Sequence, residues 1–285
     1  LFRSNDTATT EIYTLYQQDF QNNSTMNFIK EKMILAPGYP SSIQIPHALA
    51  ASWSFRNSYT VKDWKMVPMW HKLIGGFFCN GYGGTVLSAA LFGKSINILS
   101  HETILYYFLS FGLLLVNYSP NDVIYKSLET KLHPLRILTV FGDAVDSTTT
   151  ILGVYEMAKR LHPTVSLAPW VAGISTMVGG SMFRWLERKG RKGEDSNYKT
   201  EWNKPSGGLQ SGMVYIVMYH YLRRWRGVRF ARLWITLCNA SIKVVQDVGP
   251  PLFGHPIPHP AVCIYNRVQR MFALMCKRLN LGPQW

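Results

Sequence analysis

Long uncharged apolar blocks alternate with short basic segments along most of the chain. The clearest block opens the stretch Thr103–Lys126, which has no ionisable side chain except tyrosine from Thr103 to Asn121. About 19 helical residues, at roughly 1.5 Å each, span about 30 Å, the thickness of a bilayer's hydrocarbon core. Buried helices of soluble proteins are usually shorter and amphipathic. The block therefore predicts a membrane-spanning helix, with a core helix of a large soluble protein as the alternative.

Similar apolar blocks precede and follow this one. They cover Ile43–Ser58, Met66–Phe92, Ile137–Met157, Thr164–Phe183, Pro205–Leu222 and Leu233–Val248. Together the blocks predict an all-α integral membrane protein with about seven transmembrane helices. The second and fifth blocks are both rich in glycine, and this spacing indicates two inverted three-helix repeats followed by a seventh helix.

The glycines themselves suggest how the blocks are used. Small residues let membrane helices approach closely, or permit a break in a helix that lines a cavity. We expect helix breaks that shape a lumen at two pairs, Gly83–Gly84 and Gly179–Gly180.

The two ends of the chain differ from the membrane domain predicted for residues 40–250. Residues 1–39 are polar and predict an extended N-terminal arm. Residues 251–285 form a tail in which 261–279 alternates apolar and basic residues, as an amphipathic helix on a membrane surface or a partner would. His255 and His259 lie among prolines that oppose a shared helix, so we expect no metal site there.

Composition narrows the function classes. The chain has 285 residues, a net charge of +14 and a pI near 9.7, and its mean hydropathy of −0.02 averages apolar blocks with basic joints. Basic joints beside apolar spans suit anionic lipid headgroups. No zinc, RNP or recognition-helix pattern points to nucleic acid, and four cysteines without a CxxC pattern predict free thiols. No GxSxG, P-loop, HExxH or dinucleotide pattern occurs, so we expect neither an enzyme nor a cofactor.

Two acids interrupt the fourth apolar block. Asp143 and Asp146 are three residues apart, so they share one face of a helix. Acids at membrane depth are costly and indicate a cation site, a proton relay or a polar interior. The alternative is a helix turned toward a protein-filled interior in which both acids pair with nearby bases.

Several short motifs, in order, resemble the trimeric intracellular cation (TRIC) channel family over roughly residues 44–250. The segment 120–126, PNDVIYK, fits the P-x-D-x-x-Y-K pattern that ends the family's third helix, and the matching residues are Pro120, Asp122, Tyr125 and Lys126. Tyr82–Thr85 resembles the glycine-rich part of the second helix. Gly173, Gly179–Gly180 and Glu187–Arg188 resemble the fifth helix, and Lys243–Val244 a Lys-Val pair in the seventh.

The resemblance implies a homotrimer whose protomers each enclose a pore for monovalent cations, chiefly potassium, in the endoplasmic reticulum membrane. It also implies bound membrane lipid, with a phosphoinositide held by a K-E-V-x-R motif in the fourth helix. Here that motif aligns with Gly142–Asp146, so glycine replaces the lysine and Asp146 replaces the arginine. A carboxylate repels a phosphate, which argues against a phosphoinositide at this position.

Two functions follow from these observations. The first is a TRIC-like potassium channel that supplies counter-ion flux, with Asp143 and Asp146 along the ion path. The resemblance alone implies that Lys126 and Lys243 lie near the pore or its lipid sites. The second is a non-conducting TRIC-fold accessory subunit of a larger organellar complex, for which the mitochondrial inner membrane is the alternative location.

Overall fold

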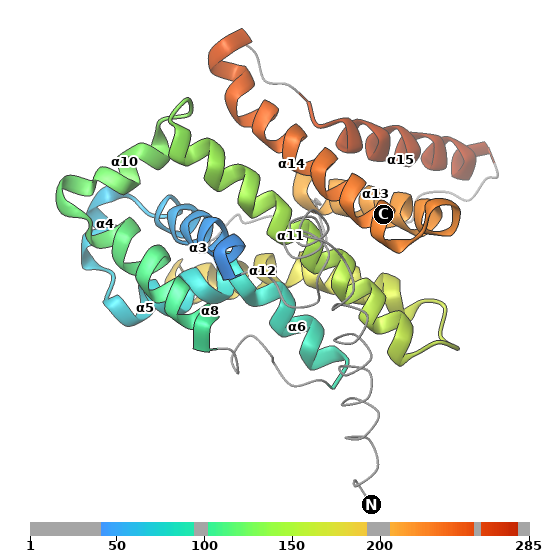
Figure 1. Ribbon diagram of the computed structural model, residues 1–285, viewed down its shortest axis with the longest axis horizontal. Coiled ribbons are helices and arrows are strands. Elements are labelled where there is room, and N and C mark those ends of the chain that lie inside the picture. Colours follow the sequence, from blue (N-terminus) through green and yellow to red (C-terminus); the bar gives the residue numbers. More distant parts are fainter. Residues whose placement is uncertain (1–40, 94–101, 193–205, 254–257, 279–285) are drawn as a thin grey trace, which may run out of the picture.

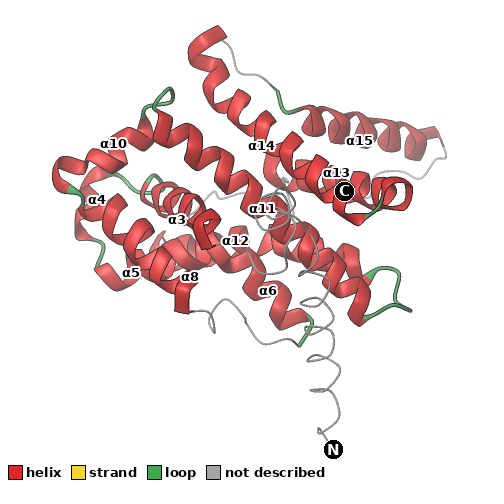
Figure 2. Ribbon diagram, in the orientation of Figure 1, coloured by secondary structure: helices red, strands yellow, loops and turns green. Residues whose placement is uncertain are grey.

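The computed structural model describes residues 41–93, 102–192, 206–253 and 258–278 (Figure 1). Every regular element in these ranges is helical, and none is a strand (Figure 2). The all-α prediction is therefore confirmed. The arm predicted for residues 1–39 lies outside the described residues.

The first half of the bundle contains three helical regions. The first is α3 (Ser41–Arg56). After the short helix α4 (Val61–Met66), the second region runs continuously through α5 (Met69–Gly75), the π-helical η1 (Gly76–Tyr82) and α6 (Gly83–Leu91). The third consists of α8 (Glu102–Tyr107), the π-helical η2 (Phe108–Leu115) and α9 (Val116–Tyr118). A 3-10 turn, η3 (Pro120–Asp122), leads to α10 (Val123–Glu129).

The second half is built from longer uninterrupted helices. These are α11 (Pro134–Leu161), α12 (Ala168–Lys192) and α13 (Gly207–Arg226), followed by α14 (Val228–Phe253) and α15 (Pro260–Arg278). Local chemistry sets some of their ends. Pro134 begins α11, and the hydroxyl of Ser206 accepts a hydrogen bond from the Leu209 amide at the start of α13. Gly227, with φ of 87°, ends α13 in a conformation that favours glycine.

Two helices run past the ends of the predicted apolar blocks. The strongly basic sequence 184–204 predicts a loop after the fifth apolar block, but the α12 helix continues to Lys192. The α14 helix passes Pro250–Pro251 and ends at Phe253. Hydropathy places the end of an apolar block where the sequence becomes polar. The α12 helix continues beyond that point because Arg, Lys, Glu and Leu favour the helical backbone.

The membrane-spanning character is clearest for one helix. Among the described residues, Pro134–Leu161 alone is both long and apolar enough to cross a bilayer, and Ile104–Tyr118 is a shorter apolar helix. The other predicted spans coincide with helices but are shorter, irregular or bounded by charge. The count of seven spans therefore stays a prediction.

Helices at corresponding places in the two halves pack against each other. The first helix, α3, packs on the fourth, α11, while α6 packs on α12, and α11 also contacts α14 across the middle of the bundle (Figure 1). The inverted relation of the two halves stays a prediction. On another side, α3 also contacts η1 and η2, and the side chains buried there include Ala48, Phe77, Tyr82 and Phe108.

The paired glycines bring α6 and α12 together. A Cβ on Gly84 would lie 1.8 Å from the Thr176 carbonyl oxygen, and one on Gly179 would lie 2.6 Å from the Gly83 carbonyl oxygen. The predicted break at Gly179–Gly180 is wrong, because α12 is α-helical through this pair. At Gly83–Gly84 the backbone changes from π-helix to α-helix. Close helix approach, rather than interruption of α12, accounts for these glycines.

Candidate functional site

A cluster of polar side chains lies where α3, η1 and α11 meet. It consists of Gln44 and His47 from α3, Tyr82 from η1, and Asp143 and Asp146 from α11, and is called the central polar cluster here. Buried apolar side chains flank it on both sides, including Ala48 and Val145. The two acids predicted from the sequence are therefore brought together with partners from the first half of the fold.

His47 connects the two acids. Its Nδ1 lies 2.7 Å from Asp143 Oδ1 and 3.6 Å from Asp146 Oδ2, while its Nε2 lies 3.3 Å from the Gly81 carbonyl oxygen. Contact with the same nitrogen confirms that both carboxylates share one face of α11. A carboxylate and a carbonyl both accept hydrogen bonds, so a doubly protonated imidazolium satisfies both ring nitrogens.

The remaining members complete a hydrogen-bonded chain. Gln44 Nε2 donates to Asp146 Oδ1 at 3.3 Å, and the Tyr82 hydroxyl donates to Gln44 Oε1 at 2.7 Å. With an imidazolium and two carboxylates, the cluster carries one net negative charge. That charge is suited to a cation and unsuited to an anion.

The two acids differ in accessibility. The Asp143 side chain is 38% exposed, whereas that of Asp146 is 4% exposed and surrounded by its partners. Asp143 is therefore the member of the pair that an ion can reach, and Asp146 is held inside the protein. The alternative stated above, acids paired with a nearby base, describes part of the geometry, since both contact His47.

The family-like segment 120–126 forms a second cluster, away from the central one. The Arg56 guanidinium, at the end of α3, donates to both Asp122 oxygens at 3.1 and 2.9 Å and to the Val116 carbonyl oxygen at 2.9 Å. It also lies 3.7 Å from the centre of the Tyr125 ring. Tyr125 donates to Asn57 Oδ1 at 2.7 Å. These contacts join the end of the third helical region to the end of α3.

Electrostatics in this second cluster fit a structural role. The hydrogen bonds from Arg56 lower the pKa of Asp122, and burial raises the pKa of Tyr125 to about 12. Asn121 and Asp122 both have positive φ, at 54° and 57°, and make the turn after Pro120. Lys126 follows on the exposed side of α10.

The structure also places Lys243 outside the central polar cluster. It lies on α14 close enough to His259 to lower the pKa of that imidazole, which burial already depresses, to about 4. His259 lies 3.1 Å from the Tyr215 hydroxyl at the junction of α13 and α15. The predicted site residues therefore fall into separate groups, and only Asp143 and Asp146 belong to the central one.

Sequence reasoning missed the partners of the acids. Gln44, His47 and Tyr82 are 5%, 6% and 4% exposed, and they lie far from the acids along the chain. The available signal was the interruption of the first apolar block by polar residues, above all His47 and Arg56. Both prove to be held by acids from other helices.

The glycine at the phosphoinositide-motif position is also explained. A Cβ on Gly142 would lie 2.4 Å from the Pro46 Cβ atom of α3. A larger side chain at this position would collide with Pro46, so glycine permits the close contact between α3 and α11.

Comparison with known proteins identifies the architecture. No family model and no curated protein sequence matches the chain. A structure described as the basis for activity of TRIC counter-ion channels in calcium release aligns with a TM-score of 0.62 and 19% identity, covering 83% of this chain and 98% of that one. The structure of the trimeric intracellular cation channel of C. elegans in the absence of Ca2+ aligns with a TM-score of 0.56 and 18% identity, covering 78% of this chain and 92% of that one.

The same C. elegans channel with bound Ca2+ aligns at a TM-score of 0.54 and 15% identity, covering 75% of this chain and 91% of that one. At such identities the agreement establishes the architecture and leaves the activity open. The expected resemblance is confirmed at the level of the fold. The chain has the fold of the trimeric intracellular cation channels.

Proposed function

We propose that the protein is a cation channel of an intracellular organelle membrane. The observation that carries this proposal is the central polar cluster, in which the accessible Asp143 carboxylate lies between the first helices of the two halves. A carboxylate between the helices of a membrane protein attracts cations and repels anions. The architecture shared with the channels described above supports the same function.

We further propose that the conducted ion is potassium, that the channel is a homotrimer, and that its surrounding lipid does not include a phosphoinositide at the Gly142 position. Pro46 occupies the space beside Gly142, and Asp146 supplies the wrong charge for a phosphate. The organelle is proposed to be the endoplasmic reticulum.

Potassium flux into liposomes containing the purified protein tests this function. We expect a potassium current in the wild type, a smaller current in Asp143→Asn, and an unchanged current in Glu129→Gln, which removes an exposed acid of α10. His47→Gln is expected to change the current in the opposite direction, because it removes the positive charge beside Asp143. A correctly folded wild type without current would refute the function, and an unaltered Asp143→Asn current would refute the role of the carboxylate.

A second function is supported by the same cluster. His47 contacts both acids, and Asp146 is enclosed, so part of the charge available to an ion is already neutralised. This favours a non-conducting TRIC-fold accessory subunit of a larger complex. The basic composition fits the mitochondrial inner membrane as the location of such a subunit. Native electrophoresis after mild detergent extraction distinguishes the two. Migration only as a free homotrimer would count against the accessory subunit.

A further inference from the structure

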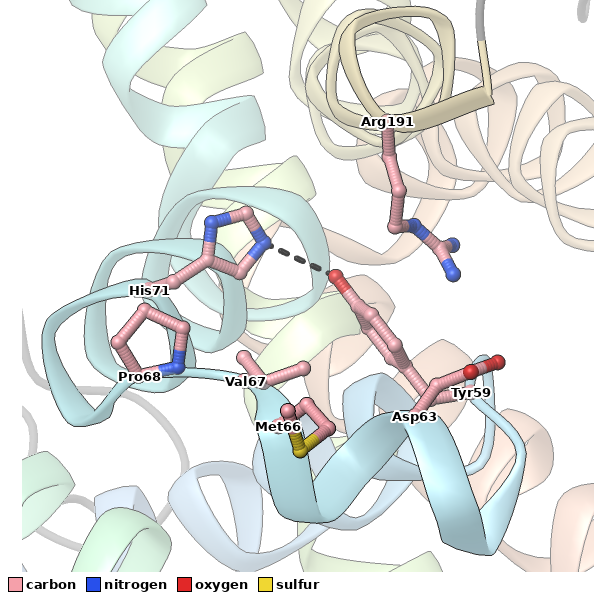
Figure 3. A pocket seen from close by; sticks show the side chains of 7 residues that line it. All are labelled: Tyr59, Asp63, Met66, Val67, Pro68, His71 and Arg191. Carbon is pink, nitrogen blue, oxygen red and sulfur yellow. Dashed lines mark hydrogen bonds between the residues drawn. The ribbon is translucent and has the colours of Figure 1, made fainter.

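A pocket of about 450 Å³ lies beside α4, apart from the central polar cluster. It opens between the turn after α3, the short helix α4, the start of α5 and the end of α12 (Figure 3). Its lining residues are Tyr59, Asp63, Met66, Val67, Pro68, His71 and Arg191.

One wall of the pocket is held by a buried carboxylate. Glu187, whose side chain is 9% exposed, accepts a hydrogen bond from the Tyr59 hydroxyl and lies 3.3 Å from His71 Nε2 and 3.1 Å from Arg191 Nε. Burial and then Glu187 raise the pKa of Tyr59, so the hydroxyl keeps its proton and donates. The Arg191 guanidinium lies 3.9 Å from the centre of the Tyr59 ring. These contacts hold Arg191 beside Tyr59 and Glu187.

The pocket presents opposite charges at an apolar wall. Arg191 pairs with Glu187 through Nε, and Figure 3 shows the terminal end of its guanidinium above Tyr59, on the side of the pocket where Asp63 also lies. A guanidinium has five N–H donors, so its terminal nitrogens suit a phosphate oxygen. The exposed Asp63 carboxylate suits an ammonium group. Met66, Val67 and Pro68 supply the apolar wall.

The surroundings of the pocket are those of a membrane interface. Met66 is 83% exposed and Trp70 is 62% exposed, and the exposed bases Lys62 and Lys65 come shortly before them on α4. Tryptophan and basic residues gather at the headgroup level of a bilayer, where large apolar side chains insert among acyl chains. A ligand seated in the pocket would extend from Arg191 toward this apolar surface.

We propose that this pocket binds the headgroup of a zwitterionic phospholipid. Arg191 binds the phosphate, Asp63 binds the ammonium group, and the acyl chains lie over Met66 and Trp70. An anionic lipid without an amine would bring no ammonium group to the Asp63 carboxylate, so it would lose that contact. This site does not depend on whether the protein conducts ions.

Native mass spectrometry of the purified full-length protein in detergent, with added lipid, tests the proposal. Phosphatidylethanolamine is expected to remain bound several-fold more than phosphatidylglycerol. Asp63→Asn should abolish this preference, and Arg191→Gln should reduce retention of both lipids. Lys189→Gln is the matched control, because it removes an exposed charge from the same helix without lining the pocket.

The variants also separate binding from folding. Asp63 is exposed, so Asp63→Asn is expected to leave the melting temperature unchanged even if Arg191→Gln loosens the contacts around Glu187. Equal retention of the two lipids by the wild type, or a preference that survives Asp63→Asn, would overturn the proposal. Glycerophosphoethanolamine, the headgroup without chains, binding as well as the lipid would overturn it in favour of a soluble ligand.

Discussion

The contact between α6 and α12 makes a direct prediction about Gly84. In Gly84→Ala, the new methyl group would lie 1.8 Å from the carbonyl oxygen of Thr176, and real Cβ atoms essentially never approach a heavy atom closer than 3.0 Å. The obstacle is backbone rather than the end of a flexible side chain, so a rotamer change cannot relieve it. The two helices must therefore separate by about an ångström or more.

The cost of that separation is large. Overpacking typically destabilises a protein by about 1–3 kcal/mol. A gap of about 0.5–1 Å also forfeits roughly a quarter to a half of the dispersion attraction between atoms that were in contact. The hydrogen bonds and packing around Ser88, which contacts Ser175 at 2.9 Å across the same interface, would be disturbed as well. We expect Gly84→Ala to lose at least about 3 kcal/mol of unfolding free energy.

The loss of stability can be measured as a fall in melting temperature during thermal unfolding in detergent, with size-exclusion chromatography as the readout of protein that stays folded. Gly190→Ala in α12 is the matched control, because no atom lies within 4 Å of its added Cβ. Alanine is a better helix former than glycine by up to about 1 kcal/mol, so this variant should be neutral or slightly stabilised. Similar melting temperatures for Gly84→Ala and the wild type would refute the close-approach explanation.

Three further predictions follow from ion pairs and titrating groups. Arg136→Leu leaves the half-buried Asp247 carboxylate without its two hydrogen bonds of 2.6 Å, so we expect the unfolding free energy to fall by about 3–5 kcal/mol. Thermal melting should show that the Arg136→Leu/Asp247→Leu double variant regains much of this stability. Because Arg56 lowers the pKa of Asp122, the ion pair stabilises the folded protein above about pH 4, and this stabilisation is lost as the pH falls further. The melting temperature of Asp122→Asn should therefore fall less with decreasing pH than that of the wild type. Because the folded protein holds His259 neutral, its stability should decline as the pH falls from about 6.5 toward 4. Hydrogen exchange of the α15 amides should become faster over this range in the wild type but not in His259→Gln.

The pattern of apolar blocks was enough to place the helices. Each predicted block coincides with a helix or a series of helical segments, because apolar length and helix propensity are local properties. The helix ends were predicted less well. The α12 helix includes the nine basic-rich residues 184–192, for which the sequence pattern predicted a loop. Hydropathy marks a change of polarity and not a change of backbone conformation.

The family-like segment shows a different balance between sequence and structure. Pro120, Asp122 and Tyr125 pointed to the fold, and the comparison with solved structures supports that fold. Their physical task became visible only through Arg56, 66 residues before Asp122, because a bidentate ion pair depends on how two distant helix ends meet. Lys126, the fourth member of the motif, lies exposed on α10.

The sequence by itself determined that the chain is helical, that its blocks are long and apolar, and that Asp143 and Asp146 share a helix face, since periodicity and spacing are local. Tertiary structure alone decided what surrounds those acids. His47 is 96 residues away from Asp143, and it reaches both carboxylates only because α3 packs on α11 with Pro46 against Gly142. Which acid stays accessible, and whether glycine pairs interrupt a helix or join two of them, depends on contacts between distant segments.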